Sequence, residues 1–319
     1  MSFTAEVKDE LSRVEATTRE AALAQLSALV RVCGTLSFHG SGRYSVRVAT
    51  ETGAVARTVL KLAHSLFDLQ TQLTVRRSVL HKTRNYLIEM PEQEALGDDL
   101  VRLGILSPGR GLVPGVPEAL LATPEARSAF VRGIFMAGGF IADPRGDFHL
   151  EMAVTGEDFA RGIVDLVGAY GVSARLNRRR GTYAIYLKSC DEVVALMRAM
   201  GAVRMARVVE AARAQKSVKN DVNRRVNAEM ANQARTTDAA AAQLELIDRA
   251  EELVGLDSLP PALREFCLAR RESPELSLAE LGAQLDPPAS KSAVYHRVLR
   301  LQALVDEAGP SKGRPDEEG

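Results

Sequence analysis

The chain has 319 residues, enough for two or three domains. Its 41 Lys and Arg balance 41 Asp and Glu, which excludes a uniformly basic nucleic-acid binder and confines any DNA contact to local patches. Cys33, Cys190 and Cys267 form no C-x-x-C pair, so they support neither a disulfide framework nor a zinc site and fit a reducing compartment. Without a leading apolar segment or a membrane-length apolar run, we expect a cytoplasmic protein.

The first third of the chain predicts alternating helices and strands. Residues 3–15 are expected to form a short helix. We assign residues 1–16 to this N-terminal helix, separate from the domain that follows. Thr17-x-x-Glu20 has the form of a capping box and would open a second helix that runs to Val32. The remaining patterns predict strands at 35–38, 44–49, 72–77 and 86–90, and helices at 55–67 and 93–103. The loop 109–115 is rich in glycine but lacks the Lys-Ser/Thr of a phosphate loop, so we interpret it as a connection.

The stretch 130–143 organises the second third. Phe130, Ile134 and Ala137 recur at helical spacing, with Thr123 as the N-cap and Pro124 at the first helical position. Small residues at Gly133 and Ala137 would let a second helix approach closely, and the glycine pair 138–139 ends the helix. Strands are then expected at 148–154, 173–178 and 183–187, and helices at 158–170 and 191–200, the last capped by Ser189-x-x-Glu192.

Residues 26–36 repeat residues 131–141: each segment is an amphipathic helix that runs into a glycine and then a strand. Both segments resemble the LAGLIDADG motif of homing endonucleases. The resemblance implies a pseudo-twofold, α+β, double αββαββα domain over 17–202, with halves at about 17–105 and 118–202. We expect one antiparallel sheet with helices on one face and a concave saddle on the other.

In that family, each motif helix ends in an acid that holds divalent metal at the scissile phosphates. The matching positions here are Cys33 and Gly138, and the earlier acidic position of the motif is Arg31 in one copy and Met136 in the other. Two-metal hydrolysis needs oxygen ligands. We therefore expect the scaffold without the nuclease chemistry, with no metal, no cofactor and no enzymatic activity.

Residues 203–236 form a predicted basic helical linker. Between positions 171 and 235 there are 14 Lys or Arg against five acids, a net charge of +9. A charge run is usually a solvated helix face, but asparagines within this one suit phosphate or base-edge contact. The DNA-contacting candidates here are Lys219, Asn220, Asn223, Arg224, Arg225 and Asn227.

Residues 237–306 predict a helical domain, and 307–319 a disordered tail. Helices are expected at 238–254, 261–271, 278–284 and 291–305, the last with Val294, Val298, Leu301 and Val305 on one face. A short helix, a break and a longer helix capped by Ser290 make a helix-turn-helix pattern, although a bare helical hairpin would share its periodicity. Polar and basic residues in the first turns favour DNA reading, and these are Ser290, Lys291, Ser292, Tyr295, His296, Arg297 and Arg300.

The whole arrangement resembles the WhiA sporulation regulators, on segments 2–11, 132–139, 219–224 and 290–297. The resemblance implies a bacterial transcription regulator of sporulation and cell division, located at the nucleoid. It also implies double-stranded DNA, RNA polymerase holoenzyme and a WhiB-type iron–sulfur regulator as partners.

Two alternatives stay open: an active LAGLIDADG-type endonuclease, and a scaffold whose saddle binds a protein. Alternation places about half of each strand's residues on either face, and the register is open at this point. The arginines that are candidates for the saddle are Arg43, Arg47, Arg76, Arg77, Arg175, Arg178 and Arg180. No ligand spacing is present among the histidines, which are His39, His64, His81, His149 and His296.

Overall fold

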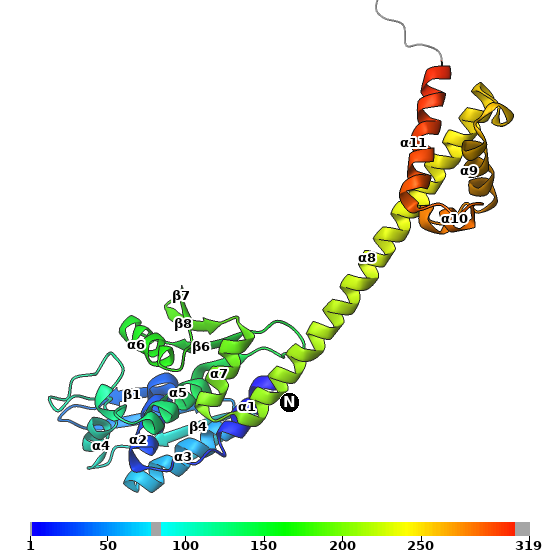
Figure 1. Cartoon of the computed structure of the whole chain (residues 1–319). Helices are drawn as coiled ribbons and strands as arrows, with labels where there is room; N and C mark the ends of the chain where they lie inside the picture. Colours follow the sequence, from blue (N-terminus) through cyan, green and yellow to red (C-terminus); the bar gives the residue numbers. More distant parts are fainter. Residues whose placement is uncertain (1, 78–83, 310–319) are drawn as a thin grey trace, which may run out of the picture. The chain divides into compact units, whose positions relative to one another are not determined.

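The computed structural model describes residues 2–77 and 84–309. Its internal contacts divide the chain into two compact units, Met1–Ser217 and Val218–Gly319. The first unit combines helices with strands and the second is helical (Figure 1), so the predicted fold class is confirmed. His81 and most of the predicted tail lie outside the described residues, and no described helix is long and apolar enough to cross a membrane.

The two halves of the first unit repeat the same order of elements, as the internal repeat predicts. The first half contains α1 (Phe3–Leu11), α2 (Arg19–Cys33), β1 (Gly34–Phe38), β2 (Tyr44–Thr50), α3 (Gly53–Phe67), β3 (Gln72–Arg77), β4 (Arg84–Met90) and α4 (Leu96–Arg102). The second half contains η1 (Glu118–Leu120), α5 (Pro124–Gly138), β5 (Gly139–Ile141), β6 (Leu150–Val154), α6 (Glu157–Gly168), β7 (Arg175–Arg179), β8 (Thr182–Leu187) and α7 (Cys190–Met200).

The strands form two antiparallel sheets, with orders β1-β2-β4-β3 and β5-β6-β8-β7. The expectation of one sheet is therefore wrong: in the described residues each half closes its own four-stranded ladder. The apolar strand residues that face the helices, among them Val48, Ile88, Met152 and Ile185, are buried, and alternation turns their neighbours to the outer face.

The motif helices α2 and α5 pack against each other in the middle of the first unit (Figure 1). A Cβ at Gly133 would lie 2.7 Å from the Gln25 carbonyl oxygen and 2.8 Å from the Ala28 Cβ, so the predicted close approach is confirmed. Gly139 follows α5 in an extended conformation that any residue adopts. It is glycine for lack of space, because its Cβ would lie 2.4 Å from the Phe135 carbonyl oxygen.

The helix starts were predicted with mixed success. Thr123 caps α5 as expected, since its hydroxyl accepts a hydrogen bond from the Ala126 amide at 3.1 Å. For α2 the capping residue is Thr18, whose hydroxyl accepts from the Ala21 amide, so the capping box at Thr17 is wrong. Ser189 makes no side-chain capping bond to α7.

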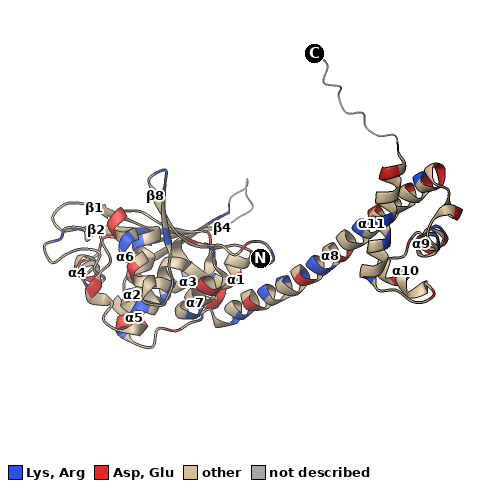
Figure 2. Cartoon of the chain, turned by 45° about the horizontal axis from the view of Figure 1, so that its top comes forward, with Lys and Arg blue, Asp and Glu red and all other residues tan. Residues whose placement is uncertain are grey.

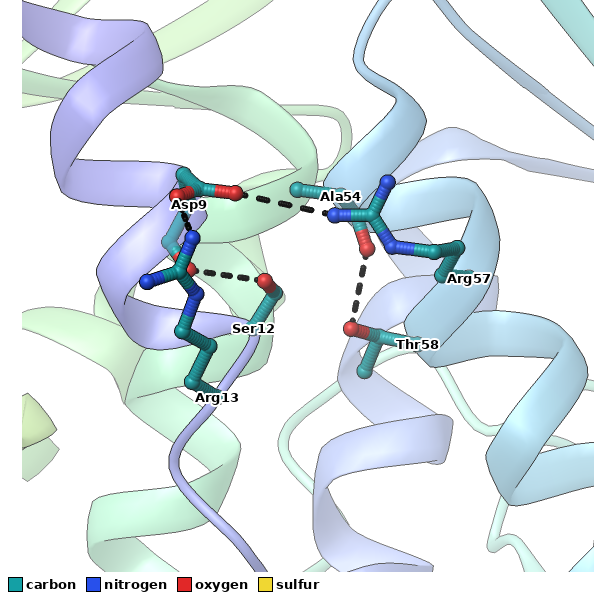
Figure 3. A network of polar contacts seen from close by, with 6 residues as sticks. All are labelled: Asp9, Ser12, Arg13, Ala54, Arg57 and Thr58. Carbon is teal, nitrogen blue, oxygen red and sulfur yellow. Dashed lines mark hydrogen bonds and ion pairs between the residues drawn. The ribbon is translucent and has the colours of Figure 1, made fainter.

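The helix α1 ends at Leu11, earlier than the predicted residue 15, and is fastened to the start of α3 (Figure 3). The Asp9 carboxylate lies 2.6 Å from Arg13, just beyond the end of α1, and 3.6 Å from Arg57 on α3. The Ser12 hydroxyl donates to the Asp9 carbonyl at 2.8 Å. Because Leu11 and Val7 are also fully buried, α1 is part of the first unit's core and not a separate N-terminal helix.

A single helix, α8 (Val203–Leu253), covers both the predicted linker and the helix expected at 238–254. The prediction that a new helix begins near residue 237 is wrong, and the reason is local. The hydroxyls of Thr236 and Thr237 donate to the carbonyls of Asn232 and Gln233, one turn back, at 3.0 and 3.1 Å. They therefore bond within a continuous helix instead of capping a new one.

After α8 the second unit contains η2 (Leu256–Ser258), α9 (Pro261–Glu272), α10 (Leu278–Gln284) and α11 (Lys291–Ala308). Leu281 of α10, Phe266 of α9 and Ile247 of α8 are fully buried in one apolar core. Val294, Leu301 and Val305 of α11 join that core, and Val298 is half-buried against it, as their spacing predicts. The predicted tail from 307 begins inside α11.

Candidate nucleic-acid interface

The helices α10 and α11 meet at a tight turn. A Cβ at Gly282 would lie 2.3 Å from the Ala289 carbonyl oxygen, so only glycine allows the chain to return this closely. The Ser290 hydroxyl accepts a hydrogen bond from the Ala293 amide at 3.2 Å, which starts α11 where it was predicted to start. These two contacts fix the direction in which α11 leaves the turn.

The first turns of α11 carry a polar, exposed surface without a carboxylate. Its core side is formed by Val294, Val298 and Leu301, and the polar side chains on the other side of the helix are exposed. Six of the seven predicted residues are exposed, and these are Ser290, Lys291, Ser292, Tyr295, His296 and Arg300. We call this set the α11 surface. It has the composition of a recognition helix, with donors and acceptors where base edges would lie.

Arg297, the seventh predicted residue, is held against α9. Its Nη1 lies 2.9 Å from Glu265 Oε2, and only 19% of its side chain is exposed. The other oxygen of Glu265 accepts a hydrogen bond from the Asp286 amide at 2.8 Å. Contact between Arg297 and a base would therefore require this ion pair to open.

A buried arginine that the sequence reasoning missed supports the α9–α10 turn. Arg270 is 1% exposed, and its Nε donates to Gln243 Oε1 on α8 at 3.0 Å. Its Nη1 donates to the carbonyl of Leu276 at 2.6 Å and to that of Ser273 at 3.2 Å. The helical spacing from Leu263 and Phe266 already places position 270 on the core face of α9, so the signal was available.

Along α8, every residue from 217 to 235 is exposed. Lys219, Asn220, Asn223 and Asn227 follow at spacings of one, three and four residues and so share one face. Arg224 stands at the edge of that face and forms an ion pair with Asp221. Arg225 lies on the other side, four residues from both Asp221 and Glu229. Five of the six predicted linker residues thus lie on or beside one face of α8. Figure 2 shows Lys and Arg (blue) recurring along this helix, with Asp and Glu (red) between them.

The strand register shows on which face of its sheet each candidate saddle arginine lies. Arg47 is on the outer face of the first sheet, where it pairs with Glu89 at 2.9 Å. Arg178 is on the opposite, helix-covered face, since it stacks on Tyr183, whose hydroxyl bonds Glu157 of α6. Alternation places Arg76, Arg175 and the unpredicted Arg179 on the outer face and Arg77 on the other, while Arg43 and Arg180 stand in turns.

The four positions that match acids of the LAGLIDADG motif are each occupied differently. The Cys33 thiol donates to the Leu29 carbonyl at 3.1 Å, and burial raises its pKa to about 11. A Cβ at Gly138 would lie 2.4 Å from the Ala153 carbonyl oxygen. Met136 is fully buried, with its sulfur 3.6 Å from Gln25 Nε2.

Arg31, the fourth of these positions, bonds to the segment that connects the two halves. Its Nη1 donates to the carbonyls of Val113 and Gly115 at 3.0 Å, and its Nη2 donates to that of Gly104. Burial lowers its pKa to about 10, so the guanidinium stays charged near neutral pH. Within the described residues, no group of three His, Cys, Asp or Glu side chains is placed to hold a metal ion.

Comparison with known proteins accounts for both units. Three family profiles match successive parts of the chain: a WhiA N-terminal LAGLIDADG-like domain at residues 19–106, a WhiA LAGLIDADG-like domain at 127–219 and a WhiA C-terminal HTH domain at 222–305. A probable cell division protein WhiA of Heliobacterium modesticaldum is 37% identical over 319 residues, which is 100% of both chains. The chain belongs to the WhiA family.

Other relatives agree. A probable cell division protein WhiA of Clostridium novyi is 36% identical over 311 residues, covering 96% of this chain and 98% of the relative. The crystal structure of full-length WhiA from Thermatoga maritima matches with a TM-score of 0.59 and 25% identity, over 97% of this chain and 100% of that one. The crystal structure of an N-terminal LAGLIDADG domain of WhiA matches with a TM-score of 0.51 and 22% identity, over 63% of this chain and 90% of that one, which supports the fold. Together with the helix-turn-helix domain, family membership supports a DNA-binding regulator.

Proposed function

We propose that this protein is a sequence-specific, double-stranded DNA-binding transcription regulator that acts in cell division and sporulation. The observation that carries the proposal is the α11 surface, an exposed, carboxylate-free set of side chains at the start of a helix fixed by the Gly282 turn. Lys291, Ser292 and His296 are the candidates for base edges, and Arg300, one turn further along, for a phosphate. The acid-poor face of α8 is the candidate for contacts to the DNA backbone.

We further propose that the nuclease chemistry of the LAGLIDADG scaffold is lost. A metal-bound hydroxide needs hard oxygen ligands, and Cys33 offers a neutral thiol while Gly138 has no room for a side chain. An active endonuclease, the alternative, would need carboxylates from elsewhere in the chain. RNA polymerase holoenzyme and a WhiB-type iron–sulfur regulator remain proposed partners, and the nucleoid the proposed location.

A protein-binding saddle is a second candidate for the first unit. On the outer face of the second sheet, Phe140 is 52% exposed and lies 6.4 Å from the His149 ring, which lies 6.1 Å from Tyr186. A hollow of about 730 Å³ beside them is lined partly by Arg179 and Lys188. Aromatic side chains and arginine are enriched in protein interfaces.

To test the proposed function, duplexes that the protein binds are first selected, and their affinity is then compared with that of scrambled duplexes. Duplexes retained by the full-length protein from a random library are compared with scrambled duplexes of the same length at one fixed salt concentration. We expect the selected sequence to bind at least ~10³-fold more tightly. Equal affinity for both would reject sequence-specific regulation, and metal-dependent cleavage that survives repurification would reject the loss of nuclease chemistry.

A further inference from the structure

A groove in the second unit is lined by cations and by no carboxylate. It measures about 460 Å³ and lies between α8, the α9–α10 turn and the start of α11. Three cations line it: Arg235 of α8, Arg270 of α9 and Lys291 of α11. The other lining residues are neutral, namely Asn232, Thr236, Ala239, Gln243, Leu276, Ser277 and Leu278.

Arg270 makes this arrangement energetically unusual. It is 1% exposed, and the hydrogen bonds from its Nε and Nη1 reach only neutral acceptors, the Gln243 amide and backbone carbonyls of the turn. Within residues 2–77 and 84–309 it forms no ion pair, and Glu275 attracts it only from a longer distance. A buried charge is costly unless it is paired, and burial accordingly lowers the Arg270 pKa.

The neighbouring cations point to the same chemistry. Arg235 and Lys291 are exposed, and neither forms an ion pair in the described part of the chain. Arg235 Nη1 donates only to Asn232 Oδ1, at a long 3.3 Å. Ser277 places its hydroxyl in the same wall, whereas the neighbouring Thr236 hydroxyl already donates to the Asn232 carbonyl. Guanidinium, ammonium and hydroxyl groups around one small groove are the donor set that proteins use for phosphate oxygens.

We propose that this groove binds a phosphate group, and that in the DNA complex the group is a backbone phosphate beside the segment contacted by the α11 surface. The DNA part of this inference rests on the proposed function. Lys291 belongs to both the groove and the α11 surface, so a phosphate here would lie next to the reading helix. An anion would also pair directly with Arg270, whose hydrogen bonds within the protein reach only neutral acceptors. The groove would thereby fix the register of α11 on the duplex.

The test uses the full-length protein with Arg235→Gln and a matched control. Arg249→Gln removes an exposed cation from the same helix, about 21 Å further along, at 1.5 Å per residue. Binding to a mixed-sequence duplex is measured at several NaCl concentrations. Because one phosphate contact releases about 0.9 counterion, we expect the slope of log K against log salt to fall by roughly 0.9 in Arg235→Gln and to stay unchanged in Arg249→Gln.

A second arm identifies the source of the phosphate. Inorganic phosphate is titrated into the wild type and both variants by calorimetry, at constant ionic strength. If Arg235→Gln loses phosphate binding but keeps the wild-type DNA slope, the groove serves a free phosphate-bearing ligand, and the DNA assignment is overturned. If Arg235→Gln changes neither quantity, the whole proposal is overturned. Failure of the wild type to bind any duplex would instead reject the proposed function, and the calorimetric arm would still decide whether the groove binds phosphate.

Discussion

Arg297 is the residue for which sequence and structure lead to different expectations. Its place in the second turn of α11 predicts contact with a base, whereas in the structure it pairs with Glu265 of α9 at 2.9 Å. We expect Arg297→Ala to weaken the second unit and to leave the preference for cognate over scrambled DNA unchanged. The physical reason is that the guanidinium is already engaged where it joins α11 to α9.

The size of the effect follows from partial burial. Hydrogen bonds to charged groups contribute about 1.5–3 kcal/mol, whereas fully exposed ion pairs contribute about 0.2–1 kcal/mol. The side chains of Arg297 and Glu265 are 19% and 32% exposed, between these limits. We therefore expect a coupling free energy of about 1–2 kcal/mol between them. The hydrogen bond from the Asp286 amide to Glu265 remains in Arg297→Ala, so Glu265 is not left without a partner.

A double-mutant cycle measures this coupling. Arg297→Ala, Glu265→Ala and the double variant are compared by hydrogen exchange of the peptides that cover α11, which reports the free energy of local opening. Cognate and scrambled duplexes are then titrated at one salt concentration under which all variants are folded. Arg300→Ala is the control, because loss of a phosphate contact should weaken both duplexes alike. A tenfold fall in specificity in Arg297→Ala, about 1.4 kcal/mol, without coupling to Glu265 would refute the reasoning.

Three further outcomes are expected. Supercoiled DNA incubated with the protein and Mg²⁺ or Mn²⁺ should stay intact, even for Cys33→Asp, because one carboxylate does not make a two-metal site. A gel assay would reveal any cleavage. Folding raises the Cys33 pKa from 9.0 to about 11. The stability that the buried neutral thiol contributes is therefore fully present below pH 9 and is lost as pH rises through 11. In thermal melts, Cys33→Ser should lose less stability than the wild type across that pH range. Lys219→Gln should lower the salt slope of duplex binding by roughly 0.9, whereas an unchanged slope would make this face of α8 a plain connector.

Elements with local signals could be predicted well. The ranges of β3 and α10 agree with the structure residue for residue, because period-two alternation and a serine cap with a turn define them within the segment itself. Ser277 and Glu280 form the full capping box, with bonds in both directions. The box expected at Ser189 failed because Glu192 is used elsewhere: its Oε1 accepts a hydrogen bond from the Ser173 amide at 3.1 Å. A local pattern cannot show that a distant residue has taken the side chain.

The candidate site divides in the same way. The exposed residues of the α11 surface follow from helical periodicity and one cap, and these were predictable. The pairing of Arg297 with Glu265 joins residues 32 positions apart and depends on how α9 crosses α11. The groove around Arg270 depends on three helices at once, and only the position of Arg270 on the apolar face of α9 hinted at it. The spacing of residues along the sequence does not show whether tertiary packing brings a carboxylate next to a given arginine or lysine.

The two positions that match the terminal acids of the motif differ physically. In the second copy the obstacle to an acid is steric, since any side chain at Gly138 would collide with the Ala153 backbone carbonyl and with Val32. In the first copy the position still carries a side chain, and the Cys33 thiol is satisfied internally by the Leu29 carbonyl. Restoring an acid would therefore require a shift of β6 against α5 in one half, but only the desolvation of a carboxylate in the other. At the earlier acidic position of the first copy, Arg31 donates to the Val113 and Gly115 carbonyls of the segment that connects the halves, so a bonded cation stands where the motif has an acid.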